Sequence, residues 1–199
     1  EGKLREWKTS DIEYLLELGY IISTFINYEK VLKQAKEDTL TGLANRYKIE
    51  KYLKEKNERK EDYCLLYMDC DEFKQVNDYY GHGTGDEVLK YIAGVIKGKL
   101  NKDEIAARMG GDEFLIVSSE ERGQVLAIEI VKELTNKPFN LEGMSSKIKC
   151  GVSIGVLNKG GDYKEDLVRV DKLMYKAKQQ GGSRVYTDRP VHPYSKYMN

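Results

Sequence analysis

Apolar residues near the start of the chain recur three or four positions apart, which predicts one long helix over about residues 9–37. Thr9 or Ser10 can cap the start of this helix. Its apolar stripe consists of Ile12, Leu15, Leu16, Ile22, Phe25, Ile26 and Leu32. Two interpretations are open. The helix packs back on the rest of the protein or, as we favour, it dimerises or transmits a signal from a preceding domain.

Beyond residue 37, short apolar runs alternate with segments of helical spacing. The predicted strands are residues 63–68, 104–109, 114–118, 147–157 and 184–186. The predicted helices are about residues 46–59, 72–80, 84–100, 121–136 and 162–180. The run 63–68 is continuously apolar, which is typical of a strand buried on both faces. The pair Gly110-Gly111 predicts a β-hairpin turn. This alternation predicts an α/β (α+β) fold, a mixed sheet covered by helices.

The composition narrows the class of protein without identifying it. Basic and acidic residues number 33 each, so no general attraction to nucleic acid or anionic membrane is expected. Cys64, Cys70 and Cys150 form no Cys-x-x-Cys pair and predict reduced, buried thiols in a cytoplasmic protein rather than a zinc site. No run approaches the ~20 apolar residues of a membrane span. The chain starts at Glu1 rather than Met, and we expect a fragment whose longer parent could be membrane-anchored.

Acidic residues lie at two predicted strand ends. Asp69 and Asp71 follow the strand 63–68, and Asp112 and Glu113 lie at the tip of the hairpin. If the hairpin lies beside that strand, the carboxylates converge. Oxygen ligands without His or Cys suit Mg²⁺ or Mn²⁺, and Mg²⁺ usually completes its shell with phosphate oxygens and water. The pattern indicates nucleoside triphosphate chemistry, and the alternative is an ordinary glycine turn with solvated acids.

Four sequence blocks carry a resemblance to a known family. They are DTLTGLANR (38–46), MDCDEFKQVNDYYGHGTGDEVL (68–89), RMGGDEF (108–114) and DKLMYKAKQQG (171–181). In this order and spacing they resemble the GGDEF domains of diguanylate cyclases, and the resemblance extends from residue 38 to about residue 186. It implies a mixed, mainly antiparallel five-stranded sheet flanked by helices, similar to nucleotide cyclases and polymerase palms.

The resemblance assigns the metal site and the catalytic candidates. The implied metal ligands are Asp69, Asp112, Glu113 and the main-chain carbonyl of Cys70, around two Mg²⁺ or Mn²⁺ ions per active site. Glu113 is either a ligand or the group that helps to deprotonate the 3′-hydroxyl. Lys74 would assist at the phosphates. The catalytic candidates are therefore Asp69, Asp112, Glu113 and Lys74.

The same resemblance assigns the contacts to a GTP substrate. Asn77 and Asp86 match the pair that reads guanine, whose N1–H and N2–H₂ donors adenine lacks. Because each unpaired buried acceptor costs roughly 1–3 kcal/mol, this pair selects guanine. The other implied contacts are the main-chain N–H groups of Glu72 and Phe73 at a helix start, Lys178 at the β- and γ-phosphates, and the open turn of Gly110 and Gly111.

The implied reaction condenses two GTP molecules into cyclic di-GMP and two pyrophosphates. Because each domain binds one GTP, a homodimer with apposed sites is implied, and no nucleic-acid partner is expected. The domain limits are then residues 1–37 for the N-terminal helix, 38–188 for the cyclase domain and 189–199 for a loose tail. The N-terminal helix also resembles the last helix of a GAF-type sensor domain, so a missing N-terminal sensor domain is expected.

The sequence departs from the family pattern at two places. Asn101 and Glu104 stand where many relatives carry the Arg-x-x-Asp product-binding site, so inhibition by product through that site is not expected. Gly182 stands where an arginine often follows Lys178, and Arg184 lies two residues further on.

Two other functions stay open: a catalytically weak domain that binds GTP or cyclic di-GMP as a signalling module, and a relaxed cyclase that accepts adenine. We also predict an ion pair between Asp38 and Arg46 that holds the connector 38–46.

Overall fold

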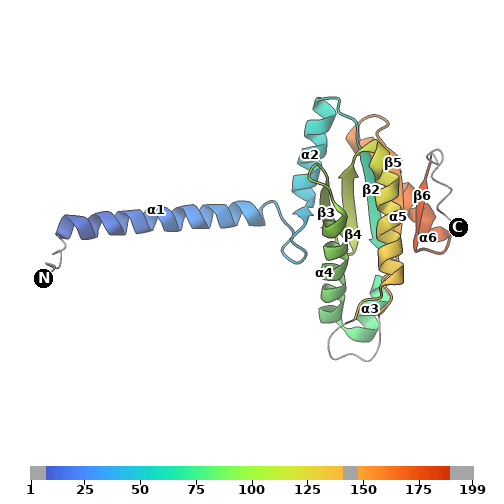
Figure 1. Cartoon of the computed structure of the whole chain (residues 1–199), viewed down its shortest axis with the longest axis horizontal. Helices are drawn as coiled ribbons and strands as arrows, with labels where there is room; N and C mark the ends of the chain where they lie inside the picture. The colour runs from blue at the N-terminus through green and yellow to red at the C-terminus, as the bar shows by residue number, and fades with distance from the viewer. Residues whose placement is uncertain (1–7, 141–147, 189–199) are drawn as a thin grey trace, which may run out of the picture. The chain divides into compact units, whose positions relative to one another are not determined.

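The computed structural model describes residues 8–140 and 148–188. Contacts divide the chain into two units, with the boundary between Lys36 and Glu37. The first unit contains one helix, α1 (Thr9–Gln34), which ends three residues before the predicted limit (Figure 1). Within the described residues, no helix is long and apolar enough to cross a membrane.

The described part of the second unit is built on one six-stranded sheet, in the order β1-β3-β4-β2-β5-β6. Its strands are β1 (Ala44–Asn45), β2 (Cys64–Cys70), β3 (Ile105–Gly110), β4 (Glu113–Ser118), β5 (Val152–Asn158) and β6 (Arg184–Thr187). The central pairings are antiparallel, and the edge strands β1 and β6 pair in parallel. The predicted mixed, mainly antiparallel sheet is confirmed. It has one strand more than expected, since two residues of the connector, Ala44 and Asn45, pair with β3.

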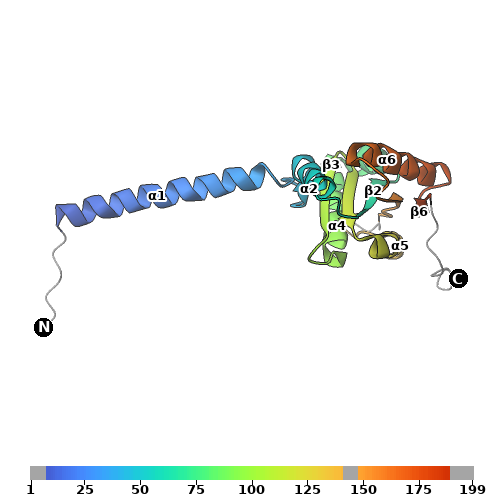
Figure 2. The same ribbon diagram turned by 90° about the horizontal axis from the view of Figure 1, so that it is seen from above.

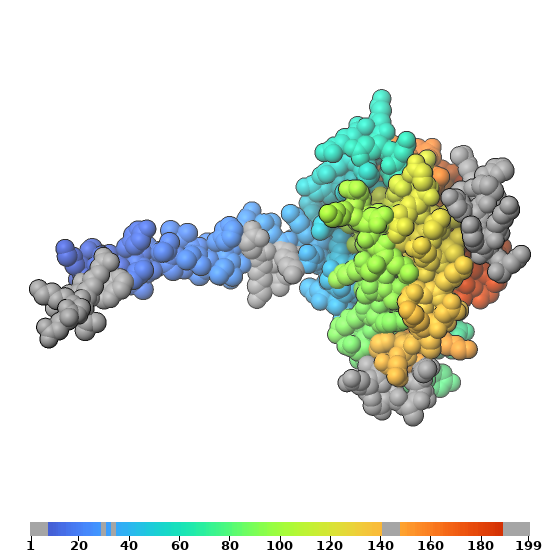
Figure 3. Space-filling view, in the orientation of Figure 1, coloured from blue at the N-terminus to red at the C-terminus, as the bar shows by residue number. Residues whose placement is uncertain are grey.

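Helices cover both faces of this sheet, because side chains on successive strand residues point to opposite faces and both sets are apolar. The core of one face joins the sheet to α4 (His82–Lys99) and α5 (Glu120–Asn136). The core of the other face joins it to α2 (Arg46–Glu58) and α6 (Tyr163–Gln179). Figure 2 shows these helices on either side of the strands, and Figure 3 shows α4 and α5 covering one face.

The central strand β2 delivers its C-terminal end to the start of α3 (Phe73–Tyr80) (Figure 1). Leu65 packs in one core and Leu66 in the other, so the strand is buried on both faces as predicted. It runs two residues beyond the predicted limit, so Asp69 and Cys70 belong to the strand and not to the loop after it. Their main-chain positions are therefore fixed by pairing on both sides.

The N-terminal boundary of β5 differs most from the prediction. The strand begins at Val152, five residues after position 147, which lies outside the described residues. Ile148 forms only an isolated bridge, with Phe139. The three cysteines are buried free thiols, as predicted.

Candidate active site

Three of the predicted acidic residues come together at the ends of β2 and β4. Asp69 pairs directly with Glu113 in the antiparallel register of these strands. Asp112 precedes β4, and its main-chain carbonyl accepts hydrogen bonds from Cys70 N (3.3 Å) and Cys70 Sγ (3.4 Å). The hairpin therefore lies beside β2, which was the condition for the carboxylates to converge.

Asp69 lies in the most unfavourable electrostatic position of this group. Its side chain is 13% exposed, and burial together with the negative charges of Asp112 and Glu113 raises its pKa to about 6. The Lys178 ammonium lies 2.5 Å from Asp69 Oδ1 and opposes that shift. The buried Oδ1 atom nevertheless accepts no hydrogen bond of good geometry. The ion pair therefore offsets part of the charge but leaves this oxygen poorly satisfied.

The donor set fits a hard divalent cation. It consists of carboxylate oxygens and main-chain carbonyls, and the poorly satisfied Asp69 Oδ1 has a lone pair available. Within the described residues, no three His, Cys, Asp or Glu side chains form a group that could hold a metal ion by itself. Mg²⁺ does not require one, because it is usually held by one or two carboxylates, with phosphate oxygens and water completing the shell.

Tyr67 is part of this cluster, and our sequence analysis missed it. It lies two residues before Asp69 on β2, hence on the same face of the sheet. Its hydroxyl donates to Glu113 Oε2 at 3.1 Å. Burial, followed by the charge of Glu113, raises the pKa of Tyr67, so the hydroxyl stays protonated and fixes one carboxylate oxygen of Glu113. The period-two pattern of a strand is the signal that would have found it.

The glycine turn between β3 and β4 is open to approach. Gly110 and Gly111 have φ values of 149° and 52°, which favour glycine, and a Cβ at either would meet no atom within 4 Å. Arg108 fastens the turn by donating from Nε (2.9 Å) and Nη2 (2.7 Å) to the Gly111 carbonyl. The turn is therefore accessible and yet held in one position.

Arg108 also corrects the predicted ion pair of the connector. Its Nη1 lies 3.4 Å from both carboxylate oxygens of Asp38, whereas Arg46 pairs with Glu50 on α2 at 2.8 Å. The predicted Asp38–Arg46 pair is wrong because β1 pairs with β3, with Arg108 opposite Asn45, and Arg46 begins α2. The connector is thus tied to the glycine turn through one guanidinium group.

The helix pair α3–α4 carries the residues assigned to base recognition. The Asn77 side chain lies against Gly85, where an added Cβ would be 2.0 Å from Asn77 Oδ1. Gly85 directly precedes Asp86 on α4. Asn77 on α3 and Asp86 on α4 therefore lie near each other where the two helices meet. Glu72 has a left-handed conformation (φ 57°) and precedes α3, which begins at Phe73. Lys74 is exposed on the first turn of that helix.

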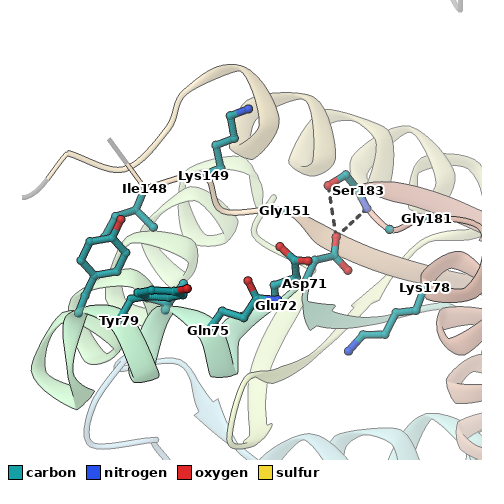
Figure 4. A pocket seen from close by; sticks show the side chains of 13 residues that line it. Asp71, Glu72, Gln75, Tyr79, Ile148, Lys149, Gly151, Lys178, Gly181 and Ser183 are labelled. Atoms are coloured by element: carbon teal, nitrogen blue, oxygen red, sulfur yellow. Dashed lines mark hydrogen bonds between the residues drawn. The ribbon is translucent and has the colours of Figure 1, made fainter. Parts of the chain in front are cut away.

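A cavity of about 710 Å³ opens beside these groups (Figure 4). Two predicted residues, Glu72 and Lys178, line it together with Asp71, Lys149, Gly151 and Gly182. Burial alone would lower the pKa of Lys178, but Asp69, Asp112 and Asp71 raise it above its usual value. The ammonium therefore stays charged, and the cavity has a fixed cation close to the carboxylate cluster.

Glu104, which stands where many relatives carry the Asp of a product-binding motif, has a structural role in this protein. Glu104 accepts from the Ser118 hydroxyl (2.5 Å) and from Asn101 N (2.7 Å), and Arg122 lies 3.1 Å from its Oε1. Asn101 itself is exposed and carries no positive charge. The carboxylate of Glu104 is therefore occupied by neighbours within the protein.

Comparisons with known proteins agree with this architecture. A family model described as "Diguanylate cyclase, GGDEF domain" matches residues 35–184. Diguanylate cyclase A of Treponema denticola is 32% identical over 193 residues, which cover 90% of this chain and 51% of that protein. Diguanylate cyclase TpbB of Pseudomonas aeruginosa is 34% identical over 161 residues, which cover 76% of this chain and 37% of that protein. The chain thus spans about half or less of the length of these curated relatives.

Solved structures show the same fold. The coiled coil and GGDEF domain of DgcB from Caulobacter crescentus, in complex with c-di-GMP, superpose with a TM-score of 0.82 at 26% identity. That match covers 90% of this chain and all of the other. The GGDEF domain of PA1120 (TpbB or YfiN) from Pseudomonas aeruginosa reaches 0.69 at 32% identity, over 77% of this chain and 94% of the other. The chain belongs to the family of GGDEF diguanylate cyclase domains.

Proposed function

We propose that this protein is an active diguanylate cyclase that condenses two GTP molecules into cyclic di-GMP. The observation that carries the proposal is the proximity of the Asp112 and Glu113 charges to the buried Asp69 carboxylate, whose partner Lys178 lines the cavity. Three carboxylates with one fixed cation suit a substrate that brings phosphates and divalent metal. The relatives that carry the name diguanylate cyclase support the same reaction.

The reaction consists of two equivalent phosphoryl transfers. The 3′-oxygen of one GTP forms a bond to the α-phosphorus of the other, the bond to the β-phosphate oxygen breaks, and pyrophosphate leaves. When bound, Mg²⁺ or Mn²⁺ would supply charge stabilisation at the α-phosphate and at the leaving group. Asp69, Asp112, Glu113 and the carbonyl of Cys70 are the groups that would hold two such ions. A bound cation would offset the unfavourable negative charge of Asp69, and this is the physical reason to place the metal site there.

The other residues orient the substrate and move its proton. Tyr67 holds Glu113 Oε2, which leaves Oε1 to serve the metal or to accept the proton of the 3′-hydroxyl. Lys178 neutralises the β- and γ-phosphates, and the main-chain N–H groups of Glu72 and Phe73 hold phosphate oxygens at the start of α3. Lys74, exposed on the first turn of α3, adds positive charge there.

Asn77 and Asp86 are proposed to read the guanine edge. The Asn77 amide oxygen and the Asp86 carboxylate accept hydrogen bonds from N1–H and N2–H₂, while adenine would leave both acceptors unpaired. The room for this arrangement comes from Gly85, because any larger residue would overlap with Asn77. Selection of GTP over ATP thus depends on the contact between α3 and α4.

Catalysis requires two copies, because one carboxylate cluster serves one GTP and the product contains two. Helix α1 is suited to bring the copies together. Five apolar or aromatic side chains on α1 are spaced alternately four and three residues apart, are 40% to 66% exposed in the single chain, and form a seam: Tyr14, Leu18, Ile21, Phe25 and Tyr28. That spacing is the pattern of a two-stranded coiled coil. Regulation by a preceding sensor domain would then act on how the two catalytic units meet.

Three incubations of the purified protein with Mg²⁺ test the proposal. One contains GTP, one contains ATP, and one contains both nucleotides. Cyclic di-GMP identified by mass is the expected product from GTP alone. Asp112→Ala should lower the rate by about 1,000-fold, since it removes a metal ligand, whereas Asp103→Ala, at an exposed position away from the cluster, should match the wild type. GTP binding without product would favour a signalling module instead, and adenine-containing products would favour a relaxed cyclase.

A further inference from the structure

Asp71 joins three segments that are far apart in the sequence. Its Oδ1 accepts a hydrogen bond from the Ser153 hydroxyl on β5 at 2.6 Å. Its Oδ2 accepts from Ser183 N at 2.6 Å and from the Ser183 hydroxyl at 3.3 Å (Figure 4). Its own N–H donates to the Gly151 carbonyl at 2.9 Å. The end of β2 is thereby fastened both to β5 and to the turn between α6 and β6.

Two glycines make room for this junction. A Cβ at Gly182 would lie 2.8 Å from Asp71 Oδ2, and the φ of 71° at this position disfavours other residues as well. A Cβ at Gly151 would lie 2.5 Å from the Ser183 hydroxyl and 3.0 Å from Asp71 Oδ2. The carboxylate therefore reaches the turn only because both neighbouring positions lack a side chain.

The turn that Asp71 holds is continuous with the end of α6, which carries Lys178. Gly181 N donates to the Lys178 carbonyl at 3.0 Å, and Gly182 N donates to the Ala177 carbonyl at 3.2 Å. Fixing Ser183 therefore also fixes the last turn of this helix. The Lys178 ammonium in turn meets Asp69, which lies on β2 two residues before Asp71.

A carboxylate that lines a cavity for phosphates would ordinarily oppose anion binding. Here the oxygens of Asp71 are directed at two hydroxyl groups and one main-chain N–H, so its charge is partly offset by fixed donors. Gly182 itself supplies no cation at this turn, where Arg184 Nε donates to the Gly182 carbonyl at 3.1 Å, and the cations that line the cavity are Lys149 and Lys178.

We propose that Asp71 is a positioning residue of the active site: it fastens the turn after α6 to the end of β2 and so places the Lys178 ammonium at the phosphate cavity. This inference rests on the proposed cyclase function for its kinetic consequence, but the placement itself is a property of the free protein. The two parts can therefore be tested separately.

A double-mutant cycle between Asp71→Asn and Lys178→Ala tests the kinetic part. Asp71→Asn should raise the KM for GTP by about five- to tenfold and change kcat by less than about twofold, because it displaces a binding group. In the Lys178→Ala background the same change should add almost nothing, since the group that Asp71 positions is already gone. Asp103→Asn is the matched control at an exposed position and should leave both constants unchanged.

Hydrogen exchange of the nucleotide-free protein tests the placement without relying on activity. The Ser183 amide, which donates to Asp71, should exchange about tenfold faster in Asp71→Asn and in Gly182→Ala than in the wild type or in Asp103→Asn. Unchanged exchange, or an equal rise in KM with and without Lys178, overturns the inference. If the wild type turns over no GTP, the proposed function fails, and the exchange rates alone decide on Asp71.

Discussion

At the scale of single residues, Asp69 carries a charge that its surroundings disfavour. Burial, with the charges of Asp112 and Glu113, raises its pKa from 3.8 to about 6 in spite of Lys178. Between about pH 4 and pH 6 the folded protein therefore keeps a proton that the unfolded chain releases, and the free energy of unfolding falls as pH rises through this window. Asp69→Asn keeps the shape and removes the charge, so it should raise the free energy of unfolding by about 3 kcal/mol at pH 7 without metal.

Urea unfolding in a chelator at several pH values measures this effect. The gain of Asp69→Asn should disappear below about pH 4, where the aspartic acid is protonated in both the folded and the unfolded state. Asp103→Asn, at an exposed position, is the matched control for the substitution itself. A gain that is the same at about pH 3.5 and pH 7 would mean that packing, rather than charge, distinguishes the two proteins.

At the scale of elements, Arg108 joins the connector to the β3–β4 turn through Asp38 and the Gly111 carbonyl. Arg108→Gln removes the charge and most of these bonds from a side chain that is only 16% exposed, so it should lower the free energy of unfolding by about 1–3 kcal/mol. Arg46→Gln breaks only an exposed pair with Glu50 and should cost less than about 0.5 kcal/mol. Urea unfolding of both variants checks the difference, and equal losses would contradict it.

These two arginines also show how far the sequence predicts the elements. Apolar periodicity was sufficient for the long helices and for the buried strand β2, because burial on defined faces sets that pattern. It was not sufficient for β1, whose two residues pair with β3 only after the connector has folded back. The partner of Asp38 depends on that pairing, so spacing along the chain pointed to Arg46 and missed Arg108.

The candidate site shows the same division between local pattern and tertiary contact. The convergence of Asp69 with Glu113 followed from the position of a hairpin beside a strand, and the register confirms it. The role of Asp71 did not follow, because its partners Ser153 and Ser183 lie 82 and 112 residues away. Such contacts depend on which strands become neighbours in the sheet, and an alternating pattern carries no information on that order.

At the scale of the whole molecule, the proposed reaction needs two copies of a chain whose first helix exposes apolar side chains. Phe25 and Ile21 are each 62% exposed on α1 in the single chain. Helices in proteins gain most of their stability from the packing of an apolar face rather than from intrinsic propensity. A second copy supplies that packing and, at the same time, the second GTP. Dimerisation and activity should therefore respond together to changes in α1.

Charges placed on the seam of α1 test this link against charges placed beside it. Ile21→Asp with Phe25→Asp should raise the dissociation constant of the dimer by about 100-fold or more, since burial of each apolar side chain contributes about 1.5–3 kcal/mol. Thr24→Asp with Asn27→Asp adds the same charge to the same helix and should leave the dimer largely intact. Sedimentation gives the dissociation constant, and the rate of cyclic di-GMP formation follows activity.

The seam variant should lose activity at dilute protein and regain it at high concentration, because its catalytic residues are unchanged. Full activity in a protein that sediments as a monomer at every concentration would separate catalysis from α1 and place the contact between the two active sites elsewhere on the catalytic unit.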